Sequence, residues 1–446
     1  MSSLPSDRPA VSLDPLKNLW AGAVSALVFY AEYLGLGATL GSKFFGETPT
    51  ASSLGALLVL LAVVVAALLA WPGRAVFLAG PRGASVAILG GLSAWLGQNL
   101  GTSPSQQVGL VGMLLVGAAL TLLAARHPKV QGALEKAPLG VVQGFMYATA
   151  TLIVCEAVFK QLYGCLQVSE LTSWAIFLPT VIGGVLWKPA LSALAAGPMR
   201  RSQQLLKLVQ PMGLPIAAGV SWCAYEATVL ALPHADKCKR LGDTSLDWSL
   251  LAQRAHQVVG AFAGAMSPLM MVSALAAGVA LGVVLLIESL TAFAPDGDSL
   301  THQKRTRLLE VSTTSNVVAA CVGGCCSSYS SARTVVLRNL GATHPMASLA
   351  HGLTVAAIAM LAGRWVAQVP SLTVAVALTL VGVQMIGEAT QTVWRDAYHP
   401  RAPLQPFLAG VLFWAVVLAS VVSGQSLVGL VIGMALAWAS YKWIAE

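Results

Sequence analysis

The sequence predicts an all-α polytopic membrane protein, and three observations lead to that fold class. The 446 residues are 56% hydrophobic and only 10% charged, whereas a soluble globular chain is about 25% charged. The mean hydropathy is +0.74. Apolar stretches long enough to cross a bilayer, about 20 residues each, recur along the whole chain. These properties exclude a soluble enzyme, a nucleic-acid-binding protein and a disordered chain.

About fourteen transmembrane segments are expected, each separated from the next by polar residues or by Gly and Pro. In chain order the apolar stretches cover residues 17–41, 51–71, 76–98, 108–125, 138–158, 173–190, 211–232, 268–294, 308–322, 333–341, 347–367, 371–388, 404–422 and 425–444. Fourteen spans use roughly 280 residues, so the connecting loops are expected to be short.

The formal charge of +8 is interpreted through membrane orientation, because Lys and Arg collect in cytoplasmic loops. With the N-terminus inside, cytoplasmic segments hold Arg126, Lys129, Lys304 and Arg305, while the outside loop 99–107 has no charge. The basic exceptions in predicted outside loops are Lys43, Lys160, Lys237, Lys239, Arg240 and Arg254. We expect no removable signal peptide, both termini in the cytoplasm, and a bacterial inner-membrane location.

Two spans contain residues that interrupt a helix. Residues 79–85 include Gly-Pro-Arg-Gly, and residues 323–331 read Gly-Gly-Cys-Cys-Ser-Ser-Tyr-Ser-Ser. Irregular backbone at membrane depth is tolerated only inside protein or beside a cavity. The interruptions fall in the third span of each set of seven, which predicts a seven-plus-seven inverted repeat. In such repeats the half-helices of spans 3 and 10 meet near the midplane and form the binding site.

Five charged residues lie within predicted spans: Glu32, Arg82, Glu226, Glu288 and Arg333. A charge in mid-span costs about 2.5–3.5 kcal/mol on insertion scales and marks a candidate functional site. The two arginines each lie beside the N-terminus of a half-helix, where free N–H groups and the helix dipole add positive potential. Because Arg binds oxyanions bidentately, these positions predict an anion pocket.

Serine hydroxyls flank both arginines and can donate to the same anion. The candidates are Ser85, Ser327, Ser328, Ser330 and Ser331. Alternatively, the serine run only caps the half-helix, for which Ser is a favoured residue.

The buried acids allow two interpretations. Glu32 and Glu288 either neutralise the two arginines, or one carboxylate holds a coupling proton or Na⁺ and its charge state depends on the substrate beside it. We assign the coupling ion to Glu288 together with Glu32, and interpret Glu226 as structural.

No cofactor or metal site is expected. The chain has no phosphate-binding Gly-x-x-x-x-Gly-Lys-Ser loop, which disfavours ATP-driven pumping. Cys325 and Cys326 are adjacent and lack the spacer of a metal-binding or redox pair. A disulfide between Cys165 and Cys238, both in predicted outside loops, is a hypothesis that requires an oxidising compartment.

The motifs resemble those of the SulP (sulfate permease) family of inorganic-anion transporters and exchangers. The matching motifs are residues 79–84 (Ala-Gly-Pro-Arg-Gly-Ala, with Arg in place of the family's Thr), Gly144-Phe145, 287–290 (Ile-Glu-Ser-Leu) with Asp296-Gly297, and Gly323-Gly324, Ala332-Arg333-Thr334, Gly341-Ala342-Thr343 and His351-Gly352. The chain departs from the family at Glu32, where Gln is usual, at Cys325-Cys326 in place of Ile-Pro, and at Tyr329, which replaces a Gly facing the pocket.

The resemblance implies a core domain moving against a gate domain, a homodimer, and an anion bound between spans 3 and 10. The corresponding segments are a cytoplasmic segment 1–16, the core at 17–127 and 268–367, and the gate at 137–233 and 371–446. The family's cytoplasmic STAS domain is expected to be missing. The implied substrate-binding residues are Arg333, Ser331, Ser330, Tyr329, Ser328, Ser85, Ala84, Arg82, Glu32 and Tyr33.

The expected function is secondary active transport of a small inorganic anion, such as sulfate or bicarbonate, by alternating access, with Na⁺ or H⁺ symport favoured over exchange. One alternative is a nucleobase permease, against which span 10 offers Arg333 and no acid. A second is transport of an amino acid or another organic ion, which Glu32 favours. A third is a membrane scaffold or sensor, which leaves the intramembrane charges without a purpose.

Overall fold

The computed structural model describes residues 14–45, 49–71, 76–130, 139–156, 173–183, 213–231, 248–293, 302–366, 404–423 and 426–445, with short pieces at 186, 193 and between 368 and 390. Residues 1–13 of the predicted cytoplasmic segment 1–16 lie outside these residues, as do Cys165 and Cys238, the cysteines of the disulfide hypothesis. Much of spans 6 and 12 does as well.

The described residues form a helical bundle in the order expected from the apolar stretches. The elements are α1 (Pro15–Phe45), α2 (Pro49–Ala70), β1 (Ala79–Gly80), α3 (Gly83–Leu100), α4 (Pro104–Ala124), α6 (Leu139–Glu156), α10 (Gly213–Ala231), α11 (Trp248–Gly260), the π-helical turn η4 (Ala261–Ala265), α12 (Pro268–Phe293), α13 (His302–Ala320), β2 (Ser328–Tyr329), α14 (Ser331–Asn339), α15 (Met346–Val366), α17 (Leu404–Ser423) and α18 (Ser426–Ala445).

Helix boundaries differ from the predicted spans where polar residues extend a helix beyond its apolar part. Helix α13 begins at His302 rather than 308, because residues 302–307 are helical but polar. Helix α4 begins at Pro104 rather than 108, because Ser103 accepts a hydrogen bond from the Gln106 N–H and Gln106 bonds back in a capping box, which fixes a helix start.

Within the described residues, five helices are long and apolar enough to cross a membrane: α1, α2, α4, α12 and α15. Helices α3, α13 and α14 do not meet that test, because they are broken or polar. Each of them nevertheless carries many buried residues, as expected for irregular or polar segments that lie inside protein at membrane depth.

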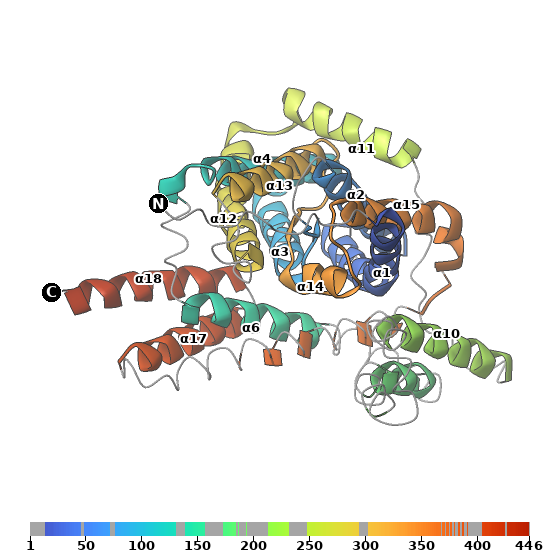
Figure 1. Ribbon diagram of the computed structural model, residues 1–446. Helices are drawn as coiled ribbons and strands as arrows, with labels where there is room; N and C mark the ends of the chain where they lie inside the picture. Colours follow the sequence, from blue (N-terminus) through green and yellow to red (C-terminus); the bar gives the residue numbers. More distant parts are fainter. Residues whose placement is uncertain are drawn as a thin grey trace, which may run out of the picture.

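The helices form two groups (Figure 1). Helices α1, α2, α3, α4, α12, α13, α14 and α15 surround β1 and β2, while α6, α17 and α18 pack on one another. Close approach within the first group depends on glycine: a Cβ at Gly278 of α12 would lie 2.3 Å from the Leu114 carbonyl oxygen of α4. Small residues at such crossings let membrane helices pack backbone against backbone. The division into core and gate stays a prediction.

Helix α11 was not predicted, and one expectation about it is wrong. Arg254, expected in an outside loop, is buried on α11 with 3% of its surface exposed. Its Nε donates to the Val322 carbonyl at 3.1 Å and its Nη2 to the Gly323 carbonyl at 2.8 Å. Burial lowers its pKa to about 10, so the guanidinium stays charged at neutral pH. A cation at this position complements the negative end of the α13 dipole. This interaction explains why Arg254 is buried on α11 instead of lying exposed in a loop.

Candidate functional site

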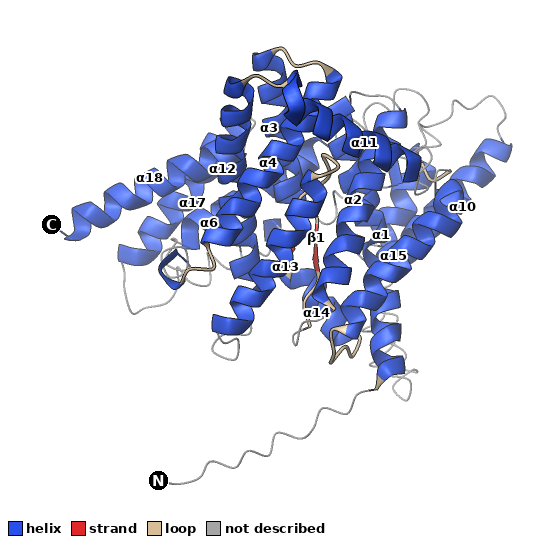
Figure 2. Cartoon of the chain, turned by 90° about the horizontal axis from the view of Figure 1, so that it is seen from above, coloured by secondary structure: helices blue, strands red, loops and turns tan. Residues whose placement is uncertain are grey.

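The two interrupted spans meet in the interior, as predicted. Strands β1 and β2 pair antiparallel, with Ala79 opposite Tyr329 and Gly80 opposite Ser328. Each strand leads directly into a half-helix, β1 into α3 and β2 into α14, so the two helix N-termini face each other across the strand pair. Figure 2 shows β1 in the middle of the surrounding helices. The strands themselves were not predicted, because a two-residue pairing is set by tertiary contact.

The first broken span receives its backbone hydrogen bonds from the second half of the chain. The Leu78 N–H donates to Thr334 Oγ1 at 3.1 Å, and the Leu78 carbonyl accepts from the Ser330 N–H at 3.1 Å. The Ser348 hydroxyl donates to the Phe77 carbonyl at 2.9 Å. Backbone groups buried away from water must be paired, so span 10 and span 11 hold span 3 in its extended form.

The second broken span is held mainly by helix α13. The Asn316 side chain accepts from the Ser327 N–H at 3.0 Å and donates to the Ser327 carbonyl at 2.9 Å. The Ser312 hydroxyl donates to the same carbonyl at 2.8 Å. The amide of Asn316 thus takes the place of a neighbouring strand, which lets the chain leave the helical path at membrane depth.

Arg333 is the most heavily bonded side chain of the site. Its Nη2 donates to Glu32 Oε1 at 2.6 Å and to the Pro81 carbonyl at 2.7 Å, and its Nε lies 3.3 Å from Glu32 Oε2. The guanidinium carbon lies 4.7 Å from the Tyr33 ring centroid. Among the described residues Nη1 has no hydrogen-bond partner, although the residue is only 2% exposed. A Cβ at Gly80 would lie 3.3 Å from Nη1, so this donor points towards the strand pair.

The other acid of the site, Glu288, lies on α12 and is also buried. The Ser328 hydroxyl donates to Glu288 Oε2 at 2.6 Å. Glu288 is therefore bonded to the residue that pairs with Gly80, whereas Glu32 is bonded to Arg333. The sequence left open which acid neutralises which arginine, and in the structure Arg333 pairs with Glu32.

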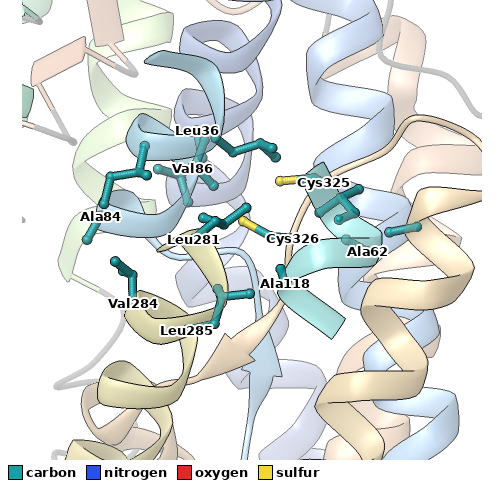
Figure 3. Close-up of a cluster of buried hydrophobic side chains, with 14 of the residues drawn as sticks. Leu36, Ala62, Ala84, Val86, Ala118, Leu281, Val284, Leu285, Cys325 and Cys326 are labelled. Atoms are coloured by element: carbon teal, nitrogen blue, oxygen red, sulfur yellow. The ribbon is translucent and has the colours of Figure 1, made fainter. Parts of the chain in front are cut away.

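Arg82 occupies the N-cap position of α3, and its side chain does not cap the helix. Its Nη1 lies 3.4 Å from the Tyr329 carbonyl, a long hydrogen bond. The Ser85 hydroxyl, one turn on, donates to the Arg82 carbonyl at 3.2 Å. The Ala84 side chain lies in an apolar cluster with Val284 and others (Figure 3). Only the backbone of Ala84 is therefore available at the N-terminus of α3.

The serine run divides between capping and other roles. Ser330 caps α14, because its hydroxyl accepts from the Arg333 N–H at 3.3 Å. The hydroxyl of Ser327 is buried with no hydrogen-bond partner among the described residues. Ser331 begins α14, but its side chain lies outside the described ones. Capping is therefore shown for Ser330, and donation to an anion by the other serines stays a prediction.

Tyr329 and the two cysteines pack into apolar surroundings. The Tyr329 ring lies 5.9 Å from the Phe77 ring and 5.3 Å from the Phe293 ring, centroid to centroid. Its hydroxyl has no hydrogen-bond partner within the described part of the chain. Cys325 and Cys326 are fully buried in the cluster of Figure 3. The ring of Tyr329 fills the space beside β1.

Sequence reasoning missed the role of His351, which it quoted only as part of a motif. His351 is fully buried on α15 and touches two residues of α1. Ser25 Oγ lies 2.7 Å from Nδ1, and Tyr33 Oη lies 2.9 Å from Nε2. A polar residue in a predicted apolar span was the only available signal. Glu226, in contrast, accepts from Trp222 Nε1 at 3.2 Å on its own helix, away from these groups.

Paired half-helices inside a bundle of apolar helices define a polytopic membrane protein with the seven-plus-seven inverted-repeat fold, as predicted. Residues 255–398, about a third of the chain, match the model described as the sulfate permease family. This match confirms the resemblance drawn from the motifs. The comparison with curated protein sequences gives no match.

Solved structures share the fold over almost the whole chain. The transmembrane domain of a cyanobacterium bicarbonate transporter, BicA, has 18% identity and a TM-score of 0.64 over 94% of this chain and 98% of that one. SLC26A9 has 13% identity and a TM-score of 0.64 over 95% of this chain, which spans 64% of that one. The murine Slc26a9 anion transporter in the inward-facing state has 14% identity and a TM-score of 0.62 over 97% of this chain and 69% of that one.

Proposed function

We propose that this protein is a secondary transporter of a small inorganic anion, working by alternating access. The proposal is carried by one observation: a buried guanidinium, Arg333, lies beside two helix N-termini that meet inside the bundle. The first N–H groups of α3 and α14 have no partner within their own helices and favour a negative solute. Similarity to structures described as a bicarbonate transporter and an anion transporter supports the same conclusion.

The anion binds between the strand pair and the two half-helices. Its ligands are Nη1 of Arg333, which faces Gly80, and the N–H groups at the start of α3 and α14. Arg82 and the Ser327 and Ser328 hydroxyls surround this position. Tyr33 supports the guanidinium through its ring, and Glu32 holds the other two donor nitrogens of the fork.

The charges of the site favour symport with a cation. Arg82 and Arg333 are balanced by Glu32 and Glu288, so the empty site is formally neutral. A bound monovalent anion makes it negative, and a charge left unbalanced in a low dielectric is costly. Uptake of H⁺ or Na⁺ on Glu288, or of H⁺ on Glu32, restores neutrality. We therefore propose coupled entry rather than exchange.

A second candidate substrate is a zwitterionic amino acid. The specific observation in its favour is the direct contact between Glu32 and Arg333, because a zwitterion offers a carboxylate to one and an ammonium to the other. This substrate would separate the pair, whereas the inorganic anion leaves it intact.

The arrangement of the chain in the membrane follows from the same proposal. The core (17–127 and 268–367) carries the site and moves against the gate (137–233 and 371–446). We place both termini in the cytoplasm of a bacterial cell and the protein in the inner membrane as a homodimer. No cofactor takes part, and no catalytic role is proposed.

The test is flux into proteoliposomes of purified protein with a panel of labelled sulfate, bicarbonate, nucleobases and amino acids. Each substrate is measured with a Na⁺ gradient, with a pH gradient, and with neither. We expect an inorganic anion to be accumulated and one of the gradients to drive it. Accumulation of an amino acid, or of no inorganic anion, would contradict the proposal.

The role of Glu288 is tested by the variant Glu288→Gln, with Glu226→Gln as the matched control outside the site. Glu288→Gln should still equilibrate the anion but lose its dependence on the driving ion, because the amide neither protonates nor carries a charge. Unchanged ion dependence would move the coupling role to Glu32.

A further inference from the structure

A buried hydrogen-bonded chain joins helices α1 and α15 next to the anion site. His351 of α15 lies between two residues of α1, Ser25 on its Nδ1 side and Tyr33 on its Nε2 side. All three are fully buried. The backbones are also close, because a Cβ at Gly22 would lie 2.3 Å from the Ala347 carbonyl oxygen. These hydrogen bonds therefore lie at a close, rigid crossing of helices α1 and α15.

The hydrogen bonds fix which ring nitrogen carries the proton. The Ser25 hydroxyl donates to the Gly22 carbonyl at 2.8 Å. Since a hydroxyl has one proton to donate, Ser25 accepts from His351, which places the ring proton on Nδ1. The bare Nε2 then accepts from the Tyr33 hydroxyl. With the imidazole neutral, each polar hydrogen of the Ser25, His351 and Tyr33 side chains has an acceptor.

This direction has a consequence for Tyr33. Its hydroxyl bonds His351, and its ring lies against the site. The Arg333 guanidinium carbon lies 4.7 Å from that ring, a distance typical of a cation–π contact. Tyr33 is adjacent in sequence to Glu32, which bonds the same guanidinium.

We propose that His351 is a positioning residue of the anion site: by accepting from the Tyr33 hydroxyl it fixes the ring against which Arg333 rests, and so aims the Arg333 fork. The inference builds on the proposed function, because it assigns His351 to the same site. Ser25 has the further role of selecting the Nδ1–H form.

Two substitutions at one position separate the two hydrogen bonds. In His351→Gln the amide oxygen reaches the place of Nε2 and still accepts from Tyr33. In His351→Asn the amide group reaches the place of Nδ1, keeps the Ser25 bond and loses Tyr33. If His351 has a purely structural role, both substitutions should weaken transport to a similar degree. If it is a positioning residue, transport should stay close to normal in His351→Gln and weaken in His351→Asn.

The transport readout is the half-saturation concentration for labelled sulfate and labelled bicarbonate in proteoliposomes. We expect His351→Asn to raise it about fivefold, the effect of one lost buried hydrogen bond, and His351→Gln to change it less than about twofold. Tyr33→Phe should match His351→Asn, and the two together should be no worse than either alone, because they remove the same bond. Equal effects of Asn and Gln would overturn the proposal.

A spectroscopic readout does not depend on transport. In protein labelled with ¹⁵N in histidine and arginine and embedded in lipid, we expect the His351 ring to be neutral and protonated on Nδ1. The Arg333 side-chain resonance, assigned by its loss in Arg333→Gln, should shift in His351→Asn and hardly in His351→Gln. A proton on Nε2, or an Arg333 resonance that His351→Asn leaves unmoved, would refute the positioning role. If the unchanged protein carries neither anion, the proposed function fails while these resonances still decide on His351.

Discussion

The two broken spans hold equivalent places in the two halves of the chain, yet they are stabilised by different partners. The first, residues 76–82, takes its hydrogen bonds from across the repeat: Thr334, Arg338 and Ser348 bond its backbone. The second, residues 321–330, takes most of them from its own half, from Asn316 on the preceding helix and from Arg254. Span 3 is therefore shaped by span 10, whereas span 10 is shaped by its neighbours.

Because of this difference, the site is more sensitive to substitutions in span 10 than to substitutions in span 3. A change in span 10 disturbs both half-helices, because Arg333 bonds the Pro81 carbonyl before the first and lies in the first turn of α14, the second. The side-chain bond that runs from the first broken span to the second is the longer one, 3.4 Å from Arg82 Nη1 to the Tyr329 carbonyl, so a change there should disturb the second span less. Variants of Arg333, Asn316, Thr334 and Ser348 test this asymmetry.

Arg333→Gln should reduce anion flux by about 100-fold or more, because a preorganised cation facing a buried anion is worth several kcal/mol. It should also lower stability by roughly 2–4 kcal/mol, since Glu32 is left as a partly buried charge without its partner. Flux and thermal unfolding in detergent measure the two effects.

The matched control is the double variant Glu32→Gln with Arg333→Gln. It should recover most of the stability, because no unbalanced charge remains, but not the flux. Flux close to that of the unchanged protein in either variant would remove Arg333 from the site.

Asn316→Ala should lower the free energy of unfolding by roughly 2–4 kcal/mol. The substitution leaves the Ser327 N–H without its acceptor, and it removes one of the two donors to the Ser327 carbonyl. Asn99→Ala is the control, since Asn99 is exposed and its side chain bonds the Trp95 carbonyl of its own helix. If both variants melt alike, helix α13 does not hold the second broken span.

Sequence patterning predicted the fold class, the order of the helices and the two interruptions, because hydropathy and Gly-Pro positions are local signals. It also predicted that Glu32, Arg82, Glu288 and Arg333 belong together. It did not predict which acid pairs with which arginine, nor the β1–β2 pairing, since these depend on a few ångströms of tertiary placement. Arg254 was misplaced because a charge near a loop is indistinguishable in sequence from a helix cap.

Thr334→Val should cost about 1–2 kcal/mol of stability, because the Leu78 N–H loses its acceptor. Thr334→Ser keeps the oxygen and should remain near the unchanged protein. Equal melting temperatures for the two variants would show that span 3 does not need this bond from span 10.

Ser348→Ala should have the smallest effect, about 1 kcal/mol or less, because the Phe77 carbonyl loses one donor. Ser423→Ala, whose hydroxyl bonds within its own exposed helix end, serves as the reference. A loss larger than that of Asn316→Ala would reverse the proposed asymmetry.

The antiparallel pairing of β1 with β2 limits the movements by which the proposed alternating access can take place. Prying α3 away from α14 would expose main-chain amides in a region without water, and each exposed group costs several kcal/mol. Sliding the whole assembly of α1–α4 and α12–α15 along α6, α17 and α18 breaks none of those bonds. The two-residue sheet holds the two half-helices together, so under the proposed transport mechanism we expect the substrate to move together with this assembly.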